Sequence, residues 1–548
     1  MFPGKTAARL RRLIWVLLHE EADMANAVIT MAFRKGRNMA RSKRWLGAGL
    51  WLVLVLAAGP GWTAEGQKPP MSSTNNSVDQ AGAAQAENPV PQGAVRSGIF
   101  TGKRLKPGAI FEYRLYVPKQ YDPKVPAALY VCQDGLNPVQ TQVMDKLIAE
   151  GAMPVCIGLF IYPATLVATG PGGADWGMRA EEYDQIGRDY PDFIIDEFLP
   201  YLRKKEGINL SGDPNLHLVG GGSSCGSCAW NMAWYRNDFF RRVCMFSPSF
   251  IAFRGGEELM VLARKSETKP IRAYFTVGTI EPSQYAGNSY LVALSADDAL
   301  KYAGYDYRFE KFVNAEHCYG RSDPVIFERV LRYLWKDWRT DKVRPLRNPS
   351  RIERLVDLDQ PWEETVEPMP ERVLPKVAAG TYSFKGGCIF LTTKDGIRRT
   401  VADGFGEITA LALSTDRWRL YVSDQSRRFV YALPILPDGS LQGRYILAPL
   451  HLAHDCITLG ASDLCVDRQD RVYAATQLGI QGIISFGITD SILPLPGDLP
   501  VERLSFGGPG NSVLYAGSKG KVFKRSWKVR GSMASDPVTK PSTPGYND

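Results

Sequence analysis

The sequence lacks the features that define several specialised protein classes. Its 548 residues contain no apolar run of about 20 residues, the length that a membrane-spanning helix needs. The 66 Lys and Arg residues exceed the 57 Asp and Glu residues by only nine, without a dense basic block, so no nucleic-acid partner is expected. The nine cysteines are scattered and odd in number, which argues against a dense disulfide framework. With 45% hydrophobic and 22% charged residues, the composition is that of a globular protein with several domains.

An apolar stretch near the N-terminus predicts export. Lys43 and Arg44 precede the run Trp45–Ala58, and Gly59-Pro60-Gly61 follows it. This run is too short for a typical membrane span and has the basic flank of a signal peptide. We therefore expect residues 1–64 to be an N-terminal extension and signal peptide, and the mature protein to be periplasmic or secreted without a transmembrane domain. An uncleaved anchor is the alternative.

The composition then changes along the chain in a way that predicts an α/β domain. Residues 65–97 are rich in Pro, Ser, Asn and Gln and are expected to form a disordered spacer. Residues 98–342 alternate short apolar runs with amphipathic helical stretches, which predicts a mostly parallel α/β sheet. The apolar runs expected to be strands are Ala127–Cys132, Pro154–Ile161, Leu216–Val219 and Arg272–Val277.

The C-terminal part has a different pattern. Residues 343–378 are rich in Pro and charge and are expected to be a linker. Residues 379–529 lose the helical period and contain short strand-like runs separated by Asp-Gly and Gly-Gly turns, which predicts an all-β module. Residues 530–548 are expected to be a disordered tail.

The segment Leu216–Trp230 (LHLVGGGSSCGSCAW) is the most informative part of the sequence. An apolar strand runs into small residues and two serines, and a helix-like stretch follows, as in a nucleophile elbow. The G-x-S-x-G pattern is complete around Ser224 and nearly complete around Ser223, where Cys225 takes the last position. The alternative interpretation is a Gly/Ser-rich turn or a phosphate-binding loop.

A serine nucleophile needs a base and an acid, and the position of one histidine suggests the base. Of five histidines, only His317 lies in the α/β region downstream of the serines, in a loop before the closing helix. Glu281 is the first carboxylate after the strand Arg272–Val277. The chain order Ser, acid, His is that of α/β-hydrolases. The alternatives are a surface histidine and an acid at a helix N-terminus.

Several stretches together resemble a known family. They are Pro126–Leu129 with Gln133-Asp134-Gly135, Gly151–Val155, Arg179 with Glu182-Tyr183-Asp184, the elbow, Ser249-Phe250 with Arg254-Gly255-Gly256, and Tyr285-Ala286-Gly287-Asn288. Over about residues 98–340 the chain resembles the putative esterase family related to enterochelin esterase and esterase D. The resemblance implies an α/β-hydrolase fold with a nucleophile at Ser223, an acid at Glu281 and a base at His317. Cys225 departs from the family pattern by replacing a glycine.

The resemblance also implies the remaining parts of an esterase site. The backbone N–H groups of Ser224 and Leu136 would form the oxyanion hole, and no cofactor would be required. Arg179 and Asp184 are candidates for binding substrate, with a surface ion pair as the alternative. Cys225, Cys228 and Cys318 would lie near the site as buried thiols, a disulfide or zinc ligands.

The β module resembles part of a gluconolactonase-type β-propeller. The similar stretches are Ile408–Asp424, Gly460–Thr476 and Leu504–Gly508. About 150 residues hold only three to four blades of about 40–45 residues each, so the module is expected to be a partial propeller. Asp463 matches a metal-binding aspartate of that family, but Thr409 stands where an asparagine is needed, so a divalent metal is the weaker alternative. A binding or stabilising appendage, able to join copies of the chain into a homo-oligomer, is the main expectation.

The sequence therefore predicts an exported serine esterase with an α/β-hydrolase domain and a partial propeller. Its substrate would be a small-molecule or carbohydrate ester, or a siderophore-linked one, as in relatives of the family. Two alternatives remain. The fold could serve as a catalytically inactive binding protein, or the β module could act as a metal-dependent lactonase.

Overall fold

The computed structural model describes residues 89–170, 172–340, 342–346 and 351–541. The predicted signal peptide and most of the predicted spacer lie outside these residues. Within them, no helix is both long enough and apolar enough to cross a membrane.

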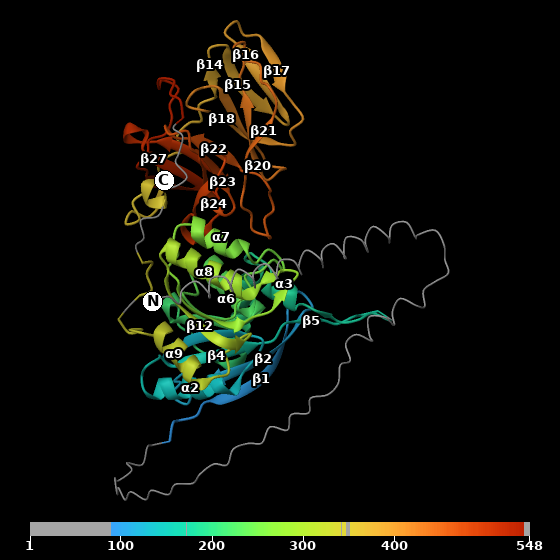
Figure 1. The fold of residues 1–548 in the computed structure, drawn as a ribbon, viewed down its shortest axis with the longest axis vertical. Helices are drawn as coiled ribbons and strands as arrows, with labels where there is room; N and C mark the ends of the chain where they lie inside the picture. Colours follow the sequence, from blue (N-terminus) through green and yellow to red (C-terminus); the bar gives the residue numbers. More distant parts are fainter. Residues whose placement is uncertain (1–88, 171, 341, 347–350, 542–548) are drawn as a thin grey trace, which may run out of the picture. The chain divides into compact units, whose positions relative to one another are not determined.

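A ten-stranded sheet forms the centre of the α/β domain, which runs from blue to yellow-green in Figure 1. Its strand order is β12-β9-β8-β7-β3-β4-β2-β5-β6, and β1 pairs with β2. Neighbours from β12 to β4 are parallel, whereas β2 runs antiparallel to β4. The predicted α/β fold with a mostly parallel sheet is confirmed. The strands are β1 (Ala94–Thr101), β2 (Ile110–Val117), β3 (Ala128–Gln133), β4 (Cys156–Ile161), β5 (Thr165–Leu166), β6 (Trp176–Gly177), β7 (His217–Gly222), β8 (Arg242–Phe246), β9 (Arg272–Ile280) and β12 (Asp306–Glu316).

Helices cover both faces of this sheet. Alternate residues of a strand point to opposite faces, and β3 sends Leu129 and Val131 into one apolar cluster and Tyr130 and Cys132 into the other. Helices α2 and α9 pack on the second cluster, and α5, α6, α7 and α8 pack on the first. The helices are α2 (Pro138–Ala149), α3 (Arg179–Tyr183), α4 (Asp189–Phe193), α5 (Leu199–Glu206), α6 (Ser224–Tyr235), α7 (Glu258–Lys265), α8 (Ser289–Ala303) and α9 (Pro324–Leu334), with a π-helical turn at Ile194–Phe198.

The carboxyl ends of the parallel strands place the candidate residues along one edge of the sheet. Asp134 follows β3, Ser223 follows β7, Ser247 follows β8, and Glu281 and His317 follow β9 and β12. In α/β sheets this edge is where ligands bind.

The C-terminal part consists of four separate four-stranded antiparallel sheets, drawn from orange to red in Figure 1. The predicted all-β domain is therefore confirmed. The sheets are β14 (Lys376–Val377), β15 (Gly380–Lys385), β16 (Cys388–Thr393) and β17 (Arg398–Ala402); β18 (Ile408–Leu413), β19 (Arg419–Asp424), β20 (Phe429–Pro434) and β21 (Tyr445–Pro449); β22 (Asp463–Val466), β23 (Val472–Thr476), β24 (Gly479–Ile483) and β25 (Thr489–Leu493); and β13 (Glu363–Thr365), β28 (Lys521–Ser526), β27 (Val513–Ser518) and β26 (Arg503–Gly507).

Two segments are more ordered than the sequence indicates. Part of the predicted linker forms β13, which pairs with β28 and so covers what would otherwise be an exposed sheet edge. In the predicted tail, the N–H of Ser532 donates to the carbonyl of Val466 (2.9 Å) and that of Thr539 to the carbonyl of Thr415 (3.0 Å). Up to residue 541, these segments are therefore integral to the all-β domain.

Candidate active site

The turn between β7 and α6 has the geometry of a nucleophile elbow. Ser223 has φ 58° and ψ −131°, a conformation that is strained for any residue with a Cβ atom. Its N–H donates to the carbonyl of Phe246 (2.9 Å) on the neighbouring strand. A Cβ atom on Gly221 would lie 2.4 Å from Cβ of Cys225, so only glycine fits there. The strand, the small residues and the helix N-terminus therefore hold Ser223 at a sharp bend.

The two serines of the elbow differ in exposure and in their contacts. Ser223 is partly exposed, and its Oγ lies 3.2 Å from Oγ of Ser249. Ser224 is buried, and its hydroxyl bonds to Asp184. Ser224 is also the first residue of α6, where backbone N–H groups have no acceptor within the helix. The geometry thus gives Ser223 a side chain that substrate can reach and Ser224 a backbone N–H that can bind an anion.

Glu281 and His317 are in direct contact, although they lie 36 positions apart. His317 Nδ1 donates to Oε2 of Glu281. The other carboxylate oxygen accepts the hydroxyl of Ser247 (2.5 Å) and the N–H of Gly278 (3.2 Å). The side chain of Glu281 is fully buried and that of His317 is 32% exposed. The acid is therefore enclosed by its donors, while the imidazole remains open to solvent.

These contacts determine the charge of the pair. Burial alone would raise the pKa of Glu281, but hydrogen bonds from His317 and Ser247 lower this pKa below its usual value. Hydrogen bonds to Cys318 and Glu281 raise the pKa of His317 to about 10. Near neutral pH the pair is therefore an imidazolium beside a carboxylate.

The elbow and the histidine loop meet at Phe246. The carbonyl of Phe246 accepts both the N–H of Ser223 and the thiol of Cys318 (3.4 Å), the residue that follows His317. A Cβ atom on Gly222 would lie 2.8 Å from Sγ of Cys318. Among the described residues, however, the hydroxyl of Ser223 bonds to Ser249 and not to His317. The structure thus joins the acid and the base directly, and brings the elbow beside their loop.

The loop that carries the predicted oxyanion residue Leu136 is tightly folded. The two residues before it, Asp134 and Gly135, have φ 61° and 76°, and the N–H of Gly135 donates to the carbonyl of Ile161 (3.2 Å). A Cβ atom on Gly135 would lie 2.2 Å from the ring of Tyr162. Glycine is therefore required at this turn.

The predicted substrate-binding residues already have protein partners. Arg179 Nη2 lies 2.8 Å from Oδ2 of Asp134 and 3.8 Å from Sγ of Cys225, so it links the loop after β3 to the elbow helix. Burial raises the pKa of Asp184, against the hydrogen bond from Ser224. Arg179 is 42% exposed and retains surface for a ligand.

Sequence reasoning missed three residues of this site. Ser247 and Ser249 follow β8, and Asp134 pairs with Arg179 after β3. Ser249 and Asp134 lie in the stretches that resemble the esterase family, whereas Ser247 lies in no motif. Its only signal is that it directly follows a buried strand of the parallel sheet.

The cysteines are free thiols at all nine positions. Cys225 and Cys228 are buried, and Cys318 is partly buried. Within the described residues, no group of three or more His, Cys, Asp or Glu side chains could hold a metal ion. In the structure, Cys225, Cys228 and Cys318 are therefore thiols and do not form a disulfide.

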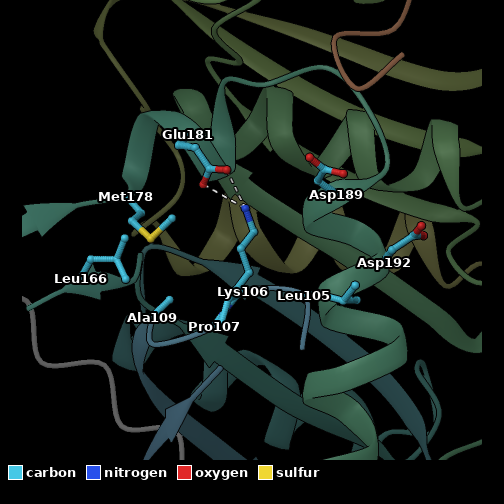
Figure 2. A pocket seen from close by; sticks show the side chains of 9 residues that line it. All are labelled: Leu105, Lys106, Pro107, Ala109, Leu166, Met178, Glu181, Asp189 and Asp192. Carbon is cyan, nitrogen blue, oxygen red and sulfur yellow. Dashed lines mark hydrogen bonds and ion pairs between the residues drawn. The ribbon is translucent and has the colours of Figure 1, made fainter. Parts of the chain in front are cut away.

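A separate pocket lies beside the loop that joins β1 and β2. Figure 2 shows the side chain of Lys106 directed at Glu181, with Asp189 and Asp192 farther along the pocket. Nζ of Lys106 lies 2.7 and 3.0 Å from the carboxylate oxygens of Glu181. None of its nine lining residues is a predicted catalytic residue. Lys106 and Glu181 therefore form an ion pair with each other, and Asp192 pairs with Arg236.

Asp463, the predicted metal ligand of the β module, is paired with an arginine. The guanidinium of Arg372 donates to Oδ1 of Asp463, and the N–H of Leu504 donates to Oδ2 (3.0 Å). Arg372 also donates to the carbonyl of Thr409 (3.1 Å), where the sequence lacks the required asparagine. The guanidinium of Arg372 is therefore the charged partner of Asp463.

We expect Arg372→Met to lower the free energy of unfolding by about 2–3 kcal/mol, because it leaves a buried carboxylate without its charged partner. Urea denaturation measures the change. Arg399→Met is the matched control, since Arg399 and Asp438 form an exposed pair (44% and 60% exposed) whose loss should change the free energy of unfolding much less. Equal effects of the two substitutions would contradict the structural role of Arg372.

A comparison with known protein families matches a segment of the α/β domain. Residues 108–317 match the family described as "Putative esterase", a segment that contains the elbow and Glu281 and ends at His317. The predicted resemblance to this family is confirmed over that segment. No curated protein matches the chain.

Several solved structures match parts of the chain at low sequence identity. A ferulic acid esterase is 19% identical, with a TM-score of 0.34, over 45% of this chain and 98% of that one. A feruloyl esterase module from Clostridium thermocellum is 15% identical, with a TM-score of 0.32, over 46% and 91%. A gluconolactonase from Xanthomonas campestris is 22% identical, with a TM-score of 0.22, over 26% of this chain and 44% of that one.

Proposed function

Because residues 108–317 match an esterase family, we propose that the protein is a carboxylic ester hydrolase with a serine mechanism. Ser223 is the nucleophile, His317 the general base and Glu281 the acid that orients it. The observation that carries this proposal is the bond between His317 and the fully buried Glu281, beside a serine at a strained strand-to-helix turn.

The mechanism follows from these groups. Glu281 holds the proton on Nδ1 of His317, which leaves Nε2 to accept the proton of Ser223 once its hydroxyl turns away from Ser249. Ser223 Oγ attacks the ester carbonyl, and His317 returns the proton to the departing alcohol. A water molecule, deprotonated by His317, then hydrolyses the acyl-enzyme and frees Ser223. The N–H groups of Ser224 and Leu136 stabilise the oxyanion in both steps.

The substrate and location of the enzyme are part of the same proposal. Arg179 and Asp184, which lie beside the elbow, line the substrate site. The proposed reaction requires no cofactor. The family resemblance favours a small-molecule or carbohydrate ester, and the N-terminal apolar run favours action in the periplasm or outside the cell. The β module serves as a binding or stabilising appendage and as a contact between copies of the chain.

A fluorophosphonate probe tests the proposal, because it reacts with an activated serine hydroxyl and leaves a stable adduct. We expect a single adduct, which peptide mapping by mass spectrometry should locate at Ser223. Heat-unfolded protein is the control and should not be labelled. Failure of the folded protein to react would favour the inactive binding protein, and an adduct at Ser224 would move the nucleophile by one residue.

A further inference from the structure

Ser247 makes an unusual set of contacts at the end of β8. It is buried, has φ 46°, and donates its N–H to the carbonyl of Thr276 (2.8 Å) on β9. Its hydroxyl donates to Oε1 of Glu281 (2.5 Å) and accepts the N–H of Cys318 (2.8 Å). The hydroxyl of Ser247 therefore donates one hydrogen bond to Glu281 and accepts another from the backbone of Cys318, the residue after His317.

These bonds connect three strand ends that are far apart in the sequence. Ser247 follows β8, Glu281 follows β9, and Cys318 lies in the loop after β12. The bond from Gly278 (3.2 Å) is weaker in geometry than that from Ser247, so Ser247 is the main donor to Oε1. Without it, the carboxylate could rotate about its last bond, and the N–H of Cys318 would lose its acceptor.

The backbone conformation of Ser247 indicates that its hydroxyl, and not only its place in the turn, is important. A φ of 46° is unfavourable for a residue with a Cβ atom, and glycine would adopt it freely. A serine at this position therefore carries a conformational cost that glycine would avoid. The two hydrogen bonds of its hydroxyl are the interactions that offset this cost.

We propose that Ser247 is a positioning residue, which fixes the carboxylate of Glu281 and the backbone after His317 so that the imidazole faces Ser223. This role rests on the proposed serine esterase function. Among the described residues, the hydroxyl of Ser247 bonds to Glu281 and Cys318 and not to Ser223, so it acts through the acid and through the loop of the base.

The test compares Ser247→Ala and Ser247→Gly, which both lack the hydroxyl but differ in backbone strain. For a small acyl ester we expect kcat to fall about 10- to 100-fold in both variants, as for other residues that orient a catalytic group. KM should stay within about twofold, because substrate contacts are unchanged. Ser289→Ala, which alters a buried serine at the start of α8, is the matched control and should retain native kcat.

The pH profile is a second readout that a purely structural role would not move. Cys318 and Glu281 are the titratable groups that act on His317, and the carboxylate is held ionised partly by Ser247. Loss of this donor makes Glu281 a stronger acceptor, so it should keep the proton on His317 to higher pH. The acidic limb of kcat/KM should therefore move upward by about half a unit in both variants.

Three outcomes decide the question. Reduced kcat and a shifted limb in both variants support the role of the hydroxyl. Native kcat in Ser247→Gly alone would show that only backbone strain matters and would overturn the proposal, as would native kcat in both. Ser223→Ala, measured alongside, distinguishes this from failure of the proposed function, since native activity in Ser223→Ala would overturn the serine mechanism itself.

Discussion

Ser223→Ala is expected to lower kcat/KM for a small acyl ester, such as p-nitrophenyl acetate, by about 10⁴- to 10⁶-fold. The alanine cannot form an acyl-enzyme, and what activity remains would come from substrate binding and the oxyanion site alone. The strained elbow should tolerate the substitution, because alanine and serine both carry a Cβ atom. Steady-state hydrolysis measures the loss, and circular dichroism checks the fold.

Ser224→Ala is the matched control for this experiment. It removes the neighbouring hydroxyl, which is buried and bonds to Asp184, but it keeps the backbone N–H at the start of α6. We expect less than about a tenfold loss. The reverse order of effects would assign the nucleophile to Ser224, and small losses in both variants would contradict a serine mechanism.

The elements that position the site were predictable because their sequence patterns are local. The runs Ala127–Cys132 and Leu216–Val219 appear as β3 and β7, with ends shifted by one to three residues. Buried parallel strands are apolar on both faces, which makes them conspicuous in a sequence. The elbow was also predictable, since a strained turn between strand and helix requires small residues at fixed spacing.

Contacts between strand ends were not predictable in the same way. Glu281 and His317 could be proposed from chain order, and their direct contact agrees with that proposal, although their catalytic roles stay predictions. Ser247 and the Asp134–Arg179 pair could not be proposed, because nothing in a single sequence states which buried strands are neighbours. Only the sheet order β12-β9-β8-β7-β3 brings these residues to one edge.

The ordered segments of the all-β domain were also not predictable, because they depend on contacts with distant parts of the chain. Proline and charge in residues 343–378 indicate the absence of a regular helix and predict a linker. A strand as short as β13 has too few residues to show a period of two, and it is stabilised by pairing with β28. Likewise, Arg372 shows no metal-site pattern in the sequence, yet it supplies the charge opposite Asp463.

Glu281→Gln should lower kcat by about 10³- to 10⁴-fold, for two reasons that concern His317. A glutamine amide can donate to Nδ1 and so favour the tautomer whose proton is on Nε2, which cannot accept the proton of Ser223. The amide also cannot stabilise the imidazolium that forms during attack. Rates with saturating ester measure the loss, and Glu316→Gln, which removes an exposed charge next to His317, should stay within about twofold of native.

The pH dependence of Glu281→Gln tests whether Glu281 acts on the protonation of His317. Hydrogen bonds to Cys318 and to Glu281 raise the pKa of His317 to about 10, and the base works only when unprotonated. Native kcat/KM should therefore rise with pH through the neutral range and level off only in alkaline solution. In Glu281→Gln the carboxylate no longer holds this proton, so the residual activity should level off at lower pH, closer to the ordinary histidine pKa of about 6.5. An unchanged profile in the variant would mean that Glu281 does not set the protonation of the base.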